Sequence, residues 1–260
     1  MTGFDNNRFA QTDYVARAGM EGIDEGLRAY MLKVYNYMAV GLAITGVIAY
    51  TFFTMAVTQD QGAAAAQLPN GTMITEFGRL IFVSPLKWVI MLAPLGMVFL
   101  LSARINKMSA SGAQIAFWVF AALMGASLSS IFLVYTHGSI ARVFFITAAS
   151  FGALSLWGYT TKKDISGWGS FLFMGLIGII LASVVNIFLG STALQFAISV
   201  IGVLVFAGLT AYDTQRIKEM YYAADHSDVV GRKAIMGALS LYLDFINLFM
   251  MLLSLFGNRN

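Results

Sequence analysis

The chain has 260 residues, of which 58% are hydrophobic and only 11% are charged. Soluble domains carry about a quarter charged residues, so this composition excludes a water-soluble globular class and indicates an integral membrane protein. The lack of cysteine excludes disulfides and thiolate sites, and the net charge of +3 suits anionic lipid headgroups rather than nucleic acid.

The N-terminal segment is polar and of mixed charge. Residues 1–30 contain neither the short apolar core nor the small-residue cleavage site of a signal peptide, so we expect no processing. A segment of such low apolar content cannot bury enough surface to fold by itself. We therefore predict a flexible tail over residues 1–29, followed by a membrane domain over residues 30–260.

The remainder of the chain divides into apolar runs that are each long enough for one membrane-spanning helix, which needs about 20 residues. Polar connections rich in turn-forming or basic residues separate them, the longest being 58–72 and 218–233. Backbone groups inside lipid must be satisfied within their own segment, which favours helices. The predicted fold class is therefore an all-α integral membrane protein with seven transmembrane helices, at 33–57, 84–103, 113–135, 139–160, 168–189, 193–216 and 234–256.

The basic residues predict the orientation of these helices. With seven spans, 12 of the 16 Lys and Arg residues lie in the N-terminal tail or in the connections on its side of the membrane, and four lie on the other side. Cytoplasmic loops carry an excess of Lys and Arg. The expected topology therefore has a cytoplasmic N-terminus and an outside C-terminus.

Two carboxylates interrupt the last two apolar runs, Asp213 in FAGLTAYDTQRIK and Asp244 in SLYLDFINLF. An acidic side chain at the centre of a membrane helix costs roughly 2.5–3.5 kcal/mol on an insertion scale. Such residues usually face the interior of the bundle, pair with another group and mark a pathway for ions or protons. The connection between the two helices makes them antiparallel neighbours. The two acids can meet if the sixth helix continues past Arg216.

Polar residues accompany both aspartates at helical spacing. Two carboxylates that share a low-dielectric site cannot both ionise cheaply, so we expect one proton to be held between them and the pair to titrate as a unit. The pair would then be a pH sensor, at which a divalent cation could replace the proton. The supporting polar residues are Thr210 and Thr214 on the sixth helix, and Ser240 and Asn247 on the seventh.

Three stretches resemble the transmembrane Bax inhibitor motif family in its bacterial branch. They are RAYMLKVYNYMAVGLAITG (28–46), AYDTQRIK (211–218) and ALSLYLDFINLFMMLLSLFG (238–257). The resemblance implies a seventh helix at the centre, wrapped by the other six, and a location in the bacterial inner membrane. It also implies a pH-sensitive calcium leak whose sensor aspartates fall on Asp213 and Asp244. A basic residue at the cytoplasmic end of the second helix latches an aspartate in that family, and Arg104 is the nearest match, with Lys107 next.

The expected function is therefore a calcium leak channel and not an enzyme, with no resident cofactor and with Ca²⁺ as the permeant ion, transiently held by Asp213 and Asp244. Expected partners are the lipid bilayer and calcium ions. A non-conducting regulator that binds other membrane proteins, such as a membrane protease or cell-death regulators, stays open as an alternative. An aspartyl intramembrane protease is a remote one, since Tyr212-Asp213 fits its first motif but Leu241 to Asp244 replaces the Gly-x-Gly-Asp of its second.

Overall fold

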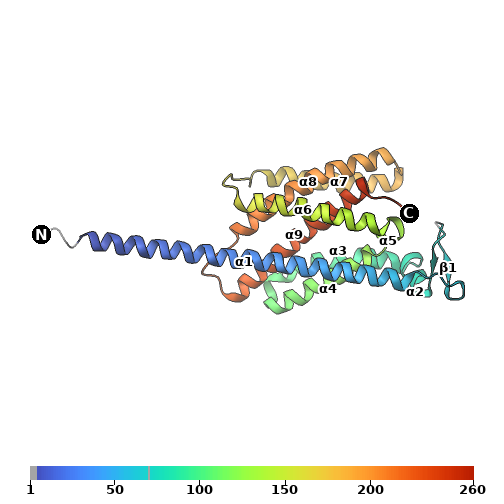
Figure 1. The fold of residues 1–260 in the computed structure, drawn as a ribbon, viewed down its shortest axis with the longest axis horizontal. Helices are drawn as coiled ribbons and strands as arrows, with labels where there is room; N and C mark the ends of the chain where they lie inside the picture. Colours follow the sequence, from blue (N-terminus) through green and yellow to red (C-terminus); the bar gives the residue numbers. More distant parts are fainter. Residues whose placement is uncertain (1–4, 70) are drawn as a thin grey trace.

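The computed structural model describes residues 5–69 and 71–260, with side chains from Glu25 onward. Its long helices confirm the seven predicted spans, since seven segments of the described chain are long and apolar enough to cross a membrane. The helices are α1 (Asp5–Ala56), α3 (Leu86–Arg104), α4 (Ala110–Leu128), α6 (His137–Thr160), α7 (Trp168–Leu189), α8 (Thr192–Glu219) and α9 (Ser227–Phe256) (Figure 1).

The helix ends differ from the predicted ends where polar residues extend a helix beyond its apolar run. α1 begins at Asp5, inside the segment 1–29; the predicted flexibility of that segment stays a prediction, and residues 1–4 lie outside the described residues. α8 continues past Arg216 to Glu219, and α9 begins at Ser227 rather than at residue 234. Hydropathy marks the part of a helix that lipid can accept, whereas the hydrogen-bonded helix continues into the polar boundary.

Short elements connect the first two spans at one end of the bundle (Figure 1). They are η1 (Gln61–Ala63), β1 (Ala66–Gln67), β2 (Met73–Ile74), α2 (Glu76–Gly78) and η2 (Arg79–Val83). β1 and β2 form an antiparallel pair in which Ala66 lies opposite Ile74. Two further short helices, η3 (Ile105–Lys107) and α5 (Ile131–Val134), extend α3 and α4.

α9 lies at the centre of the bundle (Figure 1). In its most apolar stretch 56% of the residues are buried, against 17–28% in the other six spans. α1, α4, α6 and α8 all pack against it, whereas α3 packs mainly on α4 and α7 mainly on α8. The six outer helices therefore surround α9 in two tiers. Their outer faces are apolar, as at Ile187 and Phe188 on α7, which are 77% and 85% exposed and suit contact with lipid.

A buried polar contact joins three helices of the core. The hydroxyl groups of Tyr242 on α9 and Thr45 on α1 lie 2.6 Å apart, and Thr45 donates to the backbone oxygen of Ala121 on α4 at 2.8 Å. The Tyr242 ring packs edge-on against Phe117 and Phe120. Because buried hydroxyl groups are costly without partners, this arrangement specifies how α9 is rotated about its axis, and it thereby sets the face that carries Asp244.

Candidate functional site

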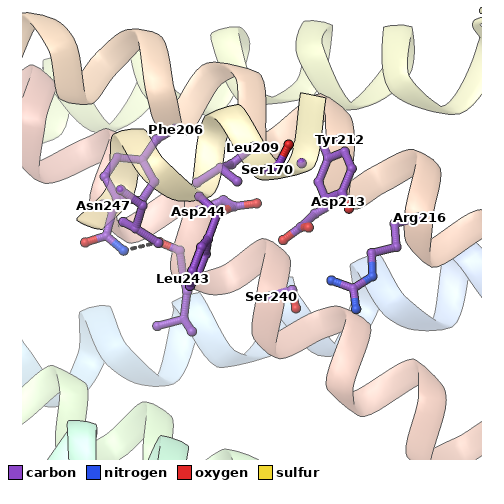
Figure 2. A pocket seen from close by; sticks show the side chains of 13 residues that line it. Ser170, Phe206, Leu209, Tyr212, Asp213, Arg216, Ser240, Leu243, Asp244 and Asn247 are labelled. Atoms are coloured by element: carbon purple, nitrogen blue, oxygen red, sulfur yellow. Dashed lines mark hydrogen bonds between the residues drawn. The ribbon is translucent and has the colours of Figure 1, made fainter. Parts of the chain in front are cut away.

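A cavity of about 530 Å³ lies among α7, α8 and α9 and contains both intramembrane aspartates (Figure 2). α8 and α9 contribute the polar groups, and α7 contributes mostly apolar ones. The lining residues are Gly169, Ser170, Phe173 and Leu176 of α7, Phe206, Leu209, Tyr212, Asp213 and Arg216 of α8, and Ser240, Leu243, Asp244 and Asn247 of α9.

The carboxyl groups of Asp213 and Asp244 point toward one another and lie within hydrogen-bonding reach (Figure 2). Asp244 is only 5% exposed, and Asp213 is partly buried. When both groups are ionised neither can donate, and the Oδ2 atom of Asp244 then has no hydrogen-bond partner among the described residues. A proton on one carboxyl group would turn the contact into a hydrogen bond and satisfy that buried oxygen.

The extension of α8 past Arg216 brings the two aspartates together. Asp213 lies about six residues from the C-terminal end of α8, and Asp244 lies about 17 residues into α9. The connection between these helices, 220–226, returns the chain in the opposite direction, and the two carboxyl groups meet inside the bundle. The sixth helix therefore continues past Arg216, which is the condition under which the sequence predicts that the two aspartates meet.

Arg216 is the cation beside the pair. It lines the cavity one helical turn beyond Asp213, and its positive charge acts on that carboxylate. Arg216 is exposed, so solvent weakens this interaction. In the sequence Arg216 stands out only as the polar end of an apolar run. Its i, i+3 spacing from Asp213 is the signal that could have assigned it to the cavity.

Arg104, the candidate latch, does not reach the pair in this conformation. It is exposed at the C-terminal end of α3 and lies outside the set of residues that line the cavity. Within residues 25–69 and 71–260, neither Arg104 nor Lys107 forms an ion pair. The assignment of a latch to Arg104 stays a prediction, and it requires a conformation in which α3 carries this residue toward α8.

The supporting polar residues divide into two groups. Ser240 and Asn247 line the cavity, and the Asn247 amide donates to the backbone oxygen of Leu243 at 2.8 Å. Thr210 and Thr214 do not line the cavity. They are fully buried and donate to the backbone oxygens of Phe206 and Thr210, both at 2.7 Å. On a helix, side chains turn by about 100° per residue, so Thr214 points well away from Asp213.

Thr214 instead belongs to a hydroxyl network between α8, α6 and α1. Its Oγ1 atom lies 2.9 Å from Ser155 Oγ, which lies 2.6 Å from the Tyr35 hydroxyl. Neither Tyr35 nor Ser155 stands out in the sequence, because isolated hydroxyl residues are common in membrane helices. This network holds a face of α8 that is turned away from the cavity, and it thereby positions the turn that carries Asp213.

Comparisons with known proteins agree with the motifs. Residues 27–260 match the family model described as "Inhibitor of apoptosis-promoting Bax1". The chain is 48% identical to a protein of Rickettsia prowazekii, over 91% of this chain and 92% of that protein. It is 46% identical to the "Inner membrane protein YbhL" of Escherichia coli, over 97% and 99% of the two chains. A protein of Caulobacter vibrioides is 45% identical over 98% of each chain. These matches extend well beyond the three motif stretches and confirm the resemblance: the chain is a member of the Bax inhibitor family of membrane proteins.

Proposed function

We propose that this protein is a pH-sensitive calcium leak channel of the bacterial inner membrane, gated by the pair Asp213 and Asp244. The proposal rests on one observation: the two carboxyl groups face each other inside a cavity among the membrane helices. Paired acids within a membrane are expensive to bury and are typically retained for ion or proton movement. Among the described residues, the buried Oδ2 atom of Asp244 lacks a partner unless a proton or a cation supplies one.

A calcium ion could take the place of the shared proton. Calcium binds oxygen ligands, and two carboxylates with the Ser240 hydroxyl and the Asn247 amide oxygen provide them from one side of the cavity. Tight calcium sites use about six to eight oxygen ligands, so this set favours transient occupancy. Transient occupancy suits passage, because a permeating ion must bind well enough to enter and weakly enough to leave.

Mild acid is expected to increase the leak. An ionised aspartate attracts a basic residue from a neighbouring helix, and such a charge-assisted bond would tie the helices together and close the path. Protonation of the aspartate removes the attraction while the basic residue stays charged. A bond between Arg216 and Asp213 would not tie two helices together, since both residues lie on α8. The tie would have to come from another helix, and Arg104 on α3 is the proposed residue.

The flux experiment uses the purified protein in liposomes that contain no other protein. We expect calcium uptake, followed with a trapped fluorescent indicator, to exceed that of empty liposomes. We also expect it to rise as the pH falls from about 8 to about 6, because the coupled pair takes up a proton. Equal uptake by protein-containing and empty liposomes at every pH would contradict the proposal. That outcome would instead favour the alternative of a non-conducting regulator that binds other membrane proteins.

The cavity gives a reason against the protease alternative. Leu243 lines the cavity directly beside Asp244. Its bulky side chain stands where an intramembrane aspartyl protease needs glycine, so that the substrate backbone can approach. We therefore propose no catalytic role for either aspartate.

The positive-inside rule and the structure together support the proposed orientation. The start of α1 and the end of α9 lie toward opposite ends of the molecule (Figure 1), as an odd number of spans requires. The E. coli relative is named an inner membrane protein. The side of the N-terminus carries most of the basic residues, which supports a cytoplasmic N-terminus.

A cysteine at position 162 is expected to react with membrane-impermeant thiol reagents only from the cytoplasmic face, and a cysteine at position 259 only from the outer face. Lys162 and Arg259 are both exposed, in the connection between α6 and α7 and beyond the end of α9. The chain has no native cysteine, so each variant carries a single target. Labelling of both positions from the same face would contradict the seven-span topology.

A further inference from the structure

A second polar cluster lies at the end of α8 and α9 remote from Arg216. The Asn186 amide donates to Gln195 Oε1 at 3.2 Å, Gln195 donates to Ser254 Oγ at 3.4 Å, and Ser199 donates to Ser254 Oγ at 3.0 Å. We call these four residues the outer polar cluster. Ser199 is fully buried, whereas Gln195 is exposed, so the cluster reaches from the surface into the bundle.

This cluster and the cavity lie on the same seam between α8 and α9. On α9, Ser240, Asp244, Asn247, Met251 and Ser254 fall within an arc of about 80° at 3.6 residues per turn. The matching arc of α8 contains Asp213, Phe206, Gly202, Ser199 and Gln195. Polar groups therefore line both ends of one seam, and a short apolar interval separates them.

Met251 fills that interval. It is seated on Gly202 so closely that a Cβ atom at position 202 would lie 2.8 Å from both Cγ and Sδ of Met251. Met251 also packs against the small apolar cluster formed by Ile179, Ile198 and Val205. From Asn247 to Ser254 the helix rises by about 10 Å. Within the described residues, this methionine and its apolar neighbours stand between the polar cavity and the outer polar cluster.

We infer that Met251, seated on Gly202, is a hydrophobic gate between the aspartate cavity and the outer polar cluster. That ions pass through this gate rests on the proposed leak. That Met251 keeps polar solutes out of the cavity does not depend on the leak. An apolar constriction excludes water and therefore ions without a tight steric block. The methionine side chain has three rotatable bonds, so a change of rotamer can clear the seam while the helix backbones stay in place. Glycine at position 202 provides the space in which the closed rotamer fits.

The inference predicts how far a polar reagent can enter from the outer end. Asn247 lines the cavity just inside the gate, so Asn247→Cys serves as the reporter in a chain that has no other cysteine. A small cationic, membrane-impermeant thiosulfonate is added to the face from which a cysteine at position 259 reacts. We expect slow labelling of the reporter alone and labelling at least about 10-fold faster when Met251→Gln is added, because glutamine keeps the length of methionine and lets water enter.

Two variants control for position and for packing. Met250→Gln makes the same chemical change one residue away, about 100° around the helix and off the seam, and Met251→Leu keeps the interval apolar. Both are expected to leave the labelling rate unchanged. If Met251→Gln does not yield folded protein, Met251→Ser is used with Met250→Ser as its control. Unchanged labelling in folded Met251→Gln or Met251→Ser, or equal acceleration by the matching Met250 control, would overturn the inference.

Calcium flux, measured for the wild type and for the Met251 variants with Asn247 intact, separates this inference from the proposed function. Faster labelling together with a several-fold higher calcium flux supports both. Faster labelling with no calcium flux at any pH supports the gate and overturns the leak. Calcium flux in the wild type with no acceleration of labelling by Met251→Gln or Met251→Ser overturns the gate and leaves the leak standing, with its route elsewhere in the bundle.

Discussion

Replacing Asp213 or Asp244 with Asn is expected to remove most of the pH dependence of calcium flux between about pH 5 and 8. A coupled titration requires two interacting carboxyl groups, and Asn keeps the shape of Asp without its ionisation. The remaining aspartate would also face an amide that can donate to its buried oxygen, so the site no longer needs a shared proton. The measurement is calcium uptake into liposomes as a function of pH for the wild type, both single variants and the double variant.

Asp164→Asn is the matched control for these variants. Asp164 lies in the connection between α6 and α7, is exposed, and accepts a hydrogen bond from the backbone N–H of Ser166 at 2.8 Å. The substitution Asp164→Asn changes the formal charge by the same amount as Asp213→Asn or Asp244→Asn. Because Asp164 does not line the cavity, the pH response should persist. A double variant of Asp213 and Asp244 that retains the full pH response would exclude the pair as the sensor.

Gly158→Ala is expected to destabilise the protein, whereas Gly152→Ala on the same helix is not. At position 158 a Cβ atom would lie 2.4 Å from the backbone oxygen of Ala211, because α6 and α8 approach closely there. A backbone atom cannot rotate away, so the two helices must separate. Overpacking of this kind costs about 1–3 kcal/mol, which corresponds to a fall of about 3–10 °C in the midpoint of thermal unfolding.

Gly152 provides the comparison because a Cβ atom there would meet no atom within 4 Å. Alanine is the better helix former by about 1 kcal/mol, so Gly152→Ala should leave the midpoint unchanged or raise it slightly. Both midpoints can be followed in detergent by the fluorescence of the four tryptophans. Equal midpoints for the two variants would show that α6 and α8 do not depend on this contact. Since α8 carries Asp213, a widened contact should also disturb the pH response.

The number of spans and the identity of the intramembrane acids could be predicted from the sequence because both are local properties. Lipid requires about 20 consecutive apolar residues for each helix, and a carboxylate within such a run stands out whatever surrounds it. The predicted pairing of Asp213 with Asp244 was also within reach, since a short connection makes consecutive helices neighbours. The predicted pairing required the sixth helix to continue past Arg216. α8 does so, as far as Glu219, and hydropathy does not mark that extension.

The sequence did not predict which side chains face the cavity or how the helices pack, because both depend on contacts between helices. Thr210 and Thr214 lie close to Asp213 in sequence, yet they face away from the cavity, where Thr214 meets Ser155 of α6. Arg216 lines the cavity, and Arg104 does not.

The seven membrane helices and the two acids in the last two of them follow from the amino-acid sequence alone. Hydropathy and charge decide this at each position, without reference to any other helix. The central position of α9, expected only from the family resemblance, is confirmed by its burial and contacts. The face of α8 that meets α9 and the seating of Met251 on Gly202 emerge only from the packing of the helices. The physical reason is that helices inside lipid gain little hydrophobic free energy by associating, so close packing and interhelical hydrogen bonds choose the contacts. Those interactions arise between residues that are far apart in the chain.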